Sequence, residues 1–91
     1  MNQFYYVYVL LSEKDNKKYT GYTKNLKLRF EQYSNGEVES IKNRRLLKLI
    51  YFEGCLNQQD ATQHEGYFKT HYGKMFIKKR LAKWFLQSSA C

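Results

Sequence analysis

A tyrosine-rich run near the N-terminus limits the possible folds of this chain more than any other feature. Residues 4–12 carry tyrosine, valine and leucine so densely that they predict a strand covered on both faces, at the centre of a sheet. Asp15-Asn16 is a turn signal, and a second short strand is expected over about residues 18–22. The two strands should form one hairpin. With a two-residue turn, Tyr8 and Tyr19 share a face, whereas a slip of one residue would separate them.

The middle of the chain predicts a helix followed by a third strand. Thr23 or Asn25 can cap the helix, which is expected over about residues 26–34 and ends at Asn35-Gly36. A polar stretch follows, and its basic cluster reads as an exposed loop. The third strand is then expected over about residues 46–53.

The C-terminal part predicts two more helices. Asn57 opens a helix that is expected to run to about Tyr72, where Gly73 breaks it, and a last helix is expected over about residues 74–86. Three strands in an antiparallel sheet with about three helices make a compact α+β domain. We expect residues 1–91 to form this single domain, since 91 residues can bury one core but not two.

The charge balance favours a polyanionic partner. Sixteen Lys and Arg face eight Asp and Glu, for a formal net charge of +8, so nucleic acid is the first candidate. No apolar run is long enough for a membrane span and no signal segment follows Met1, which predicts a soluble, cytoplasmic protein without a membrane partner. Cys55 and Cys91 have no partners at metal-ligand spacing and are expected to be reduced thiols.

Glu65 is the most informative single residue because it falls on an otherwise apolar helical stripe. Ala61, Glu65, Phe68 and Tyr72 are spaced at i, i+4, i+7 and i+11. A carboxylate on such a face would lose solvation unless a cation such as Mg²⁺ or Mn²⁺ met it. The simpler alternative is a surface ion pair with Lys69 at i,i+4. His64 and His71 are two helical turns apart, about 10 Å, which is too far to share a metal.

The ordered set of Tyr8, Tyr19-Thr20-Gly21, Arg29, Tyr33 and Glu65 resembles the GIY-YIG endonuclease family, and most closely its small stand-alone members and the nuclease domain of UvrC. Taken singly, each tyrosine is better explained as strand packing. The resemblance departs at Tyr6, which stands where the first motif has glycine. It departs again at Tyr22, where UvrC-like domains carry lysine.

The resemblance implies metal-dependent hydrolysis of a phosphodiester in DNA, with RNA not excluded and a role in repair or on structured DNA. Glu65 would hold Mg²⁺ or Mn²⁺, and Arg29 would bind a phosphate oxygen pair as negative charge develops. Tyr8 or Tyr19 would orient or deprotonate the attacking water, and Tyr33 would assist proton transfer or hold Arg29. Family nucleases often gain targeting from attached domains, which leaves room for a protein partner.

Several basic residues are candidates for phosphate contacts: Lys42, Arg44 and Arg45 in the polar loop, and Lys74 and Lys78 on the last helix. They would serve equally well in the main alternative, a non-catalytic module that binds nucleic acid with the same fold. A small RNA- or ribosome-associated protein is a further alternative, which size and charge fit as well. Neither alternative needs a carboxylate near the phosphate.

Overall fold

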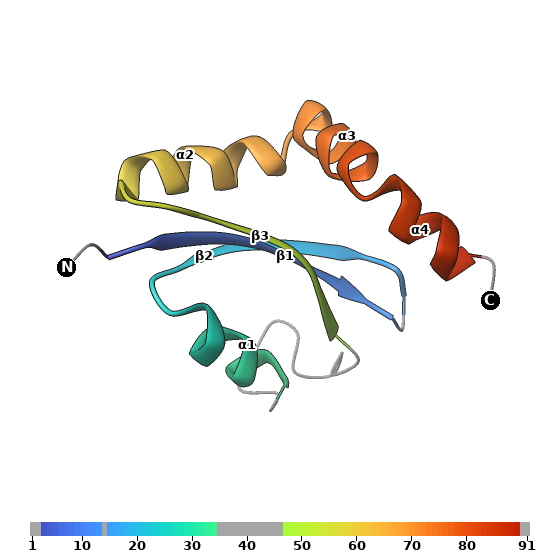
Figure 1. Cartoon of the computed structure of the whole chain (residues 1–91), viewed down its shortest axis with the longest axis horizontal. Helices are drawn as coiled ribbons and strands as arrows, with labels where there is room; N and C mark the ends of the chain where they lie inside the picture. The colour runs from blue at the N-terminus through green and yellow to red at the C-terminus, as the bar shows by residue number, and fades with distance from the viewer. Residues whose placement is uncertain (1–2, 14, 35–46, 90–91) are drawn as a thin grey trace.

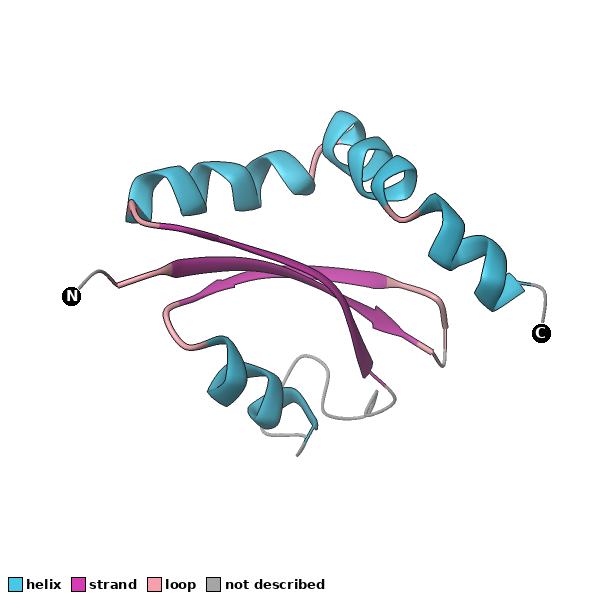
Figure 2. Cartoon of the chain, viewed as in Figure 1, coloured by secondary structure: helices cyan, strands magenta, loops and turns pink. Residues whose placement is uncertain are grey.

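The computed structural model describes residues 3–13, 15–34 and 47–89, without the side chains of residues 33, 34, 88 and 89. Three strands and four helices form in this part of the chain, and Figure 2 distinguishes them by colour. They are, in order, β1 (Tyr5–Ser12), β2 (Lys18–Thr23), α1 (Leu26–Ser34), β3 (Leu47–Cys55), α2 (Gln58–Phe68), α3 (His71–Arg80) and α4 (Ala82–Ser89).

The three strands form one antiparallel sheet in the order β2-β1-β3, so the tyrosine-rich run is the central strand, as its composition predicts. The register pairs Tyr8 with Gly21 and Leu10 with Tyr19. The hairpin turn is longer than the predicted two residues, since Ser12 pairs with Lys17 and Asn16 adopts a left-handed φ of 59°. Because the turn is longer by an even number of residues, Tyr8 and Tyr19 still share a face.

Helices cover both faces of the sheet (Figure 1). Helix α1 lies on one side, while α2 and α3 lie on the other. Val7 and Val9 pack toward α2, in a core cluster with Ala61, Phe68 and Ile77. Tyr8 and Leu10 point to the opposite face, where side chains from β2, α1 and β3 pack on them: Tyr19, Leu26, Phe30, Leu47 and Leu49. The alternation of β1 residues between two cores follows from the two-residue period of a strand.

The helix after β3 begins where the sequence predicts it but ends earlier. The Asn57 side chain caps α2 by accepting hydrogen bonds from the amides of Gln59 (2.8 Å) and Asp60 (3.1 Å). The expectation that the helix runs to Tyr72 and stops at Gly73 is wrong. Helix α2 ends at Phe68, and Thr70 caps a new helix by accepting from the Gly73 amide at 3.2 Å.

Gly73 is needed for close packing rather than for a helix stop. It is buried, and a Cβ at this position would overlap the carbonyl oxygen of Tyr67 and lie 2.6 Å from the Phe68 Cα. Backbone atoms cannot move aside as a flexible side chain can. The absence of a side chain therefore lets α3 cross directly over the end of α2.

We expect Gly73→Ala to destabilise the protein by about 2–3 kcal/mol or more, because the added methyl forces the two helices apart. Chemical denaturation of the variant measures this loss. Gly66→Ala is the matched control, since a Cβ there meets nothing within 4 Å and α2 is already helical. A Gly73→Ala variant as stable as the wild type would contradict the steric explanation.

The expected single last helix is two helices separated at Leu81, and α4 runs toward the hairpin end of the sheet (Figure 1). Two lysines attach it there: the Lys18 ammonium lies 5.1 Å from the Phe85 ring centroid and the Lys48 ammonium 5.5 Å from that of Trp84. Within the described ranges, the helices are all too short or too polar to cross a membrane.

Candidate active site

Tyr8 and Arg29 meet on the α1 face of the sheet. The Tyr8 side chain is only 2% exposed and its ring lies over Gly21, where a Cβ would overlap the phenol. The Tyr8 hydroxyl accepts a hydrogen bond of 3.3 Å from Nε of Arg29. Glycine at position 21 therefore lets a tyrosine from the central strand reach across β2 to the arginine of α1.

Arg29 is fixed from a second direction by a residue that sequence reasoning missed. Its Nη1 donates to Oε1 of Gln32 at 3.3 Å, an i,i+3 contact within α1. The i,i+3 spacing of Arg29 and Gln32 is the feature of the sequence that could have identified Gln32 as a partner. Arg29 is half-buried, and its hydrogen bonds to the Tyr8 hydroxyl and the Gln32 amide oxygen orient the guanidinium. A planar cation oriented in this way is suited to an incoming phosphate.

The two remaining tyrosines of the predicted set also belong to elements of this face. Tyr19 is half-buried on β2 and packs in the same cluster as Tyr8. Tyr33 belongs to α1, but its side chain lies outside the described part of the structure. Tyr8, Tyr19 and Arg29 are thus brought together.

Glu65 comes from α2, on the other side of the sheet. Its predicted neighbours Ala61 and Phe68 are buried, whereas Tyr72 is 73% exposed, because α2 ends before it. The Glu65 side chain is half-buried and its carboxylate lies 3.3 Å from the Lys69 ammonium, which is the simple i,i+4 ion pair. Such a pair contributes only about 0.2–0.5 kcal/mol to helix stability.

The direction of Glu65 follows from its neighbour His64. Successive helical residues differ by about 100°, so His64 and Glu65 flank the buried line of Ala61 and Phe68 on opposite sides. His64 Nδ1 pairs with Oε2 of Glu53, which places the His64 flank toward β3. Glu65 is consequently on the flank toward β2, the edge strand that also carries Tyr19 and Gly21.

The Glu65 carboxylate is a suitable ligand for a hard divalent cation that keeps most of its water ligands. The described residues contain no group of three or more His, Cys, Asp or Glu side chains able to enclose a metal ion. Mg²⁺ commonly binds through one or two carboxylates with substrate phosphates and water, so a single half-buried carboxylate is compatible with it. The Tyr22 hydroxyl, on the same β2 edge, is buried without a hydrogen-bond partner in the described residues.

A second polar cluster ties α2 to β3 and has a structural explanation. Glu53 accepts from the Tyr51 hydroxyl at 3.1 Å and pairs with His64, whose ring packs 4.4 Å from that of Phe68. Burial first, and then the Glu53 charge and hydrogen bond, raise the pKa of Tyr51. Tyr51 is therefore a protonated donor at neutral pH. His71 belongs to α3 and is not part of this cluster.

Of the two cysteines expected to be thiols, Cys55 is a free cysteine and Cys91 lies outside the described residues. Cys55 lies at the end of β3, and its Sγ lies 3.8 Å from the carbonyl oxygen of Tyr5. Burial, followed by the nearby carboxylates of Glu53 and Asp60, raises the pKa of the Cys55 thiol. It is thus in the less reactive, protonated form at neutral pH.

The basic residues proposed for phosphate contacts fall in two groups. Lys74 and Lys78 are exposed on α3, whose last turn is also basic. Lys42, Arg44 and Arg45 lie outside the described residues.

Comparison with known proteins identifies the domain. Residues 4–80 match the family model described as the GIY-YIG catalytic domain. A UPF0213 protein of Pediococcus pentosaceus is 45% identical over 83 residues, which cover 87% of this chain and 85% of that protein. A UPF0213 protein of Limosilactobacillus reuteri is 43% identical over 68 residues (71% of this chain, 70% of that protein), and the UPF0213 protein YazA of Bacillus subtilis 38% over 69 residues (75% and 67%).

No solved structure matches the chain significantly. The family match nevertheless spans all three strands of the sheet and α1, α2 and α3. The chain therefore belongs to the GIY-YIG family of nuclease-type domains.

Proposed function

We propose that this protein is a divalent-metal-dependent endonuclease that hydrolyses phosphodiester bonds in DNA, with structured or damaged DNA as its preferred substrate. The observation that carries the proposal is the Arg29 guanidinium held at 3.3 Å from the Tyr8 hydroxyl in a GIY-YIG domain. A core contact alone would not need a charged partner for a buried tyrosine. The net charge of +8 is also suited to DNA.

Arg29 binds the phosphate in this proposal. Its hydrogen bonds to Tyr8 and Gln32 use Nε and Nη1 and hold the guanidinium in one orientation, and the planar guanidinium fork suits the oxygens of a phosphate. Its charge strengthens binding as negative charge develops on the phosphate in the transition state. Tyr8 and Gln32 keep the fork in place and thereby reduce the reorganisation required when the substrate arrives.

A tyrosine handles the proton of the attacking water. Tyr8 is the first candidate, because its hydroxyl accepts the hydrogen bond from Nε of Arg29 and so lies beside the group that would bind the phosphate. Tyr19, in the same cluster, is the second candidate. Tyr33 on α1 would assist the transfer or hold Arg29.

Glu65 would hold Mg²⁺ or Mn²⁺ through its carboxylate. The bound ion would supply Lewis-acid stabilisation of charge on the phosphate and the leaving oxygen. Lys69 is the present partner of Glu65 and would have to release it. The exchange is feasible because a solvent-accessible ion pair of this type is weak.

The test is cleavage of labelled supercoiled, branched and single-stranded DNA by the purified protein. We expect cutting with Mg²⁺ or Mn²⁺ and none in EDTA, with one of the three substrates preferred. Cleavage of an RNA of the same sequence, compared with that of the DNA, shows whether the protein prefers deoxyribose or ribose. Salt-sensitive binding of all substrates without cutting at any metal concentration would instead support a non-catalytic binding module, or a nuclease that requires a protein partner.

The basic residues give a prediction that does not depend on catalysis. Removing one phosphate-binding cation should reduce the slope of log K against log salt by about 0.9, so Lys74→Ala with Lys78→Ala should reduce it by up to about 1.8. Fluorescence anisotropy in EDTA at several salt concentrations measures the slope. The triple change of Lys42, Arg44 and Arg45 to alanine tests the loop in the same way. An unaltered slope in both variants would place the DNA surface elsewhere.

A further inference from the structure

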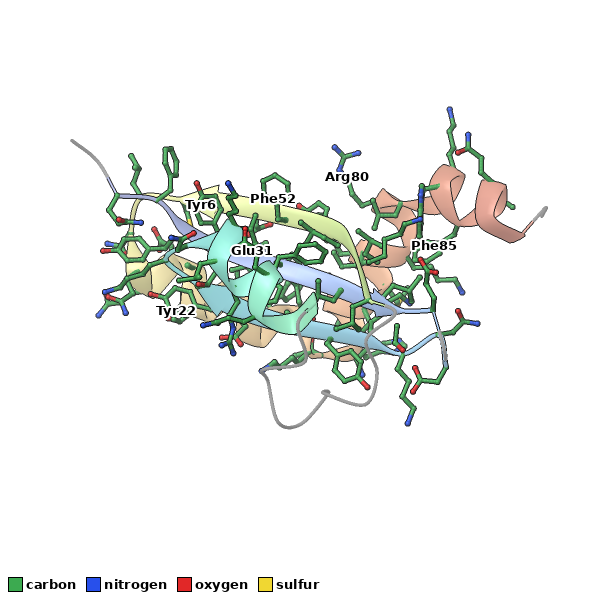
Figure 3. All side chains as sticks on the ribbon, turned by 90° about the horizontal axis from the view of Figure 1, so that it is seen from below. Tyr6, Tyr22, Glu31, Phe52, Arg80 and Phe85 are labelled. Atoms are coloured by element: carbon green, nitrogen blue, oxygen red, sulfur yellow. The ribbon has the colours of Figure 1, made fainter. Side chains whose placement is uncertain are left out.

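An open groove of about 800 Å³ lies on the α1 face, on the side of α1 that is nearer to β3. Three of its aromatic side chains come from β1, β3 and the residue before β1, namely Tyr6, Phe52 and Phe4, and a fourth, Phe30, comes from α1. Lys24, Lys27 and Glu31 are polar lining residues. Figure 3 views this face and shows Tyr6, Glu31 and Phe52 gathered beside α1. The volume is within the range of about 300–1,000 Å³ that small-molecule sites occupy.

The rings of Phe4, Tyr6 and Phe52 form a continuous set, in which Tyr6 is half-buried and the other two are exposed. The Phe4 and Tyr6 ring centroids are 6.3 Å apart, and those of Tyr6 and Phe52 are 6.4 Å apart. Phe4 is 46% exposed and Phe52 is 53% exposed. Gly54 makes room for the set, because a Cβ there would press on the rings of Tyr6 at 3.2 Å and Phe4 at 3.3 Å. The sheet therefore presents aromatic rings to solvent where α1 does not cover it.

Charge favours nucleic acid as the occupant. Lysines line the groove, in a protein whose net charge is +8. Exposed rings beside cations are the elements that bind single-stranded nucleic acid, since bases stack on the rings while phosphates meet the cations. A carboxylate such as Glu31 can accept a hydrogen bond from the amino group of an unpaired base.

The strand register places the groove next to the candidate active site. Phe52 lies opposite Tyr8 on β3, and Gly21 lies opposite Tyr8 on β2, so the three form one row on the same face. With strands about 4.8 Å apart, Phe52 is about 10 Å across the sheet from Gly21. A DNA strand cut at the candidate site would thus bring its neighbouring nucleotides to the rings.

We propose that this groove stacks unpaired bases of a single-stranded DNA segment. Its position beside the cutting site rests on the proposed function, but the binding itself does not require catalysis. Selection of unpaired bases would direct the nuclease toward branched or damaged DNA. Fully paired DNA keeps its bases in the stack and cannot use the groove.

The experiment compares ligands that differ only in their bases. A labelled twelve-nucleotide oligothymidine, an abasic oligomer of the same length and charge, and a blunt duplex are titrated with the full chain in EDTA, by fluorescence anisotropy. We expect oligothymidine to bind roughly tenfold more tightly than the abasic oligomer or better, as expected for stacking of one or two bases. Equal affinity for the two single strands would overturn the proposal.

The variant Phe4→Leu/Phe52→Leu removes the rings but keeps apolar side chains, so that folding is preserved. It should lose most of the preference for oligothymidine and keep its affinity for the abasic oligomer. Tyr72→Leu is the matched control, because Tyr72 is an aromatic on α3 that is 73% exposed and away from the groove. If the variant retains the full preference, the bases are bound elsewhere and the proposal fails.

Two further readouts separate the possible outcomes. A 2-aminopurine placed in the oligomer should change its fluorescence on binding to the wild type but not to the double variant. Sedimentation of the free protein tests a second copy as occupant: a wild-type dimer that the double variant dissociates, with no effect of oligothymidine, would overturn the proposal. Base-selective binding without cleavage would support the groove proposal and contradict the nuclease function. Cleavage without base selectivity would support the nuclease function and overturn the groove proposal.

Discussion

Glu65→Gln is expected to abolish detectable cleavage. The variant keeps the size and polarity of the side chain but removes the charge that would hold the divalent ion. Loss of several kcal/mol of transition-state stabilisation corresponds to a rate decrease of at least about 10². DNA affinity in EDTA should stay within about twofold, because binding depends mainly on cationic contacts to phosphates. Gel-based cleavage at saturating DNA, over a range of Mg²⁺ and Mn²⁺ concentrations, is the measurement.

Two controls separate metal binding from the ion pair that Glu65 makes with Lys69. Lys69→Ala removes the partner but leaves the carboxylate, so it should retain cleavage. Glu13→Gln makes the same chemical change at an exposed residue of the hairpin turn, and should also retain it. If Glu65→Gln cuts at the wild-type rate, or if Lys69→Ala is equally inactive, Glu65 has no more than a structural role.

The shared face of Tyr8 and Tyr19 in the hairpin was predictable from the sequence, because it depends only on whether the number of turn residues is even or odd. The turn is longer than expected, since Asn16 takes a left-handed conformation and the Asp15 side chain accepts from the Lys17 amide at 3.1 Å. An even change in turn length still leaves Tyr8 and Tyr19 on one face. The central position of β1 was equally clear, because only a strand covered on both faces needs apolar residues at successive positions.

The helices after β3 were less predictable, because a glycine can either end a helix or lie within one where two helices pack closely. Glycine commonly ends a helix, and Gly73 was assigned that role, yet it is an interior residue of α3 that permits contact with α2. A steric requirement between two helices leaves no periodic pattern. Thr70 was the available signal, since a threonine three residues before Gly73 can cap a helix.

The candidate site was predictable as a set of residues but not as a geometry. The resemblance to the GIY-YIG family implied Tyr8, Tyr19 and Arg29 as site residues, and the structure brings them together. The resemblance did not reveal that Glu65 approaches from the opposite side of the sheet. The exposed position of Phe52 could not be predicted from the sequence either. It depends on how β3 pairs with β1, and that pairing changes register between Val9 and Leu10 of β1.

Arg29→Ala is expected to lower the cleavage rate by about 10² or more, as for removal of one preorganised contact to transition-state charge. Arg29→Lys keeps the charge but loses the planar fork and the Nε donor to Tyr8, so its rate should be intermediate. Lys17→Ala is the control, because it removes an exposed cation of the hairpin turn that does not line the groove. Rates at saturating DNA exclude the effect of weaker binding.

The role of Tyr8 can be tested by combining Arg29→Ala with Tyr8→Phe. The second change removes the Tyr8 hydroxyl but keeps the ring over Gly21. If the Tyr8 hydroxyl acts by positioning Arg29, the double variant should be no slower than Arg29→Ala alone, because the two changes remove one interaction. If Tyr8 also takes the proton from water, the two losses should multiply and the pH dependence of the rate should change. A decrease of less than a few-fold in Arg29→Ala would contradict its phosphate-binding role. In that case its contact with Tyr8 would be only a core hydrogen bond.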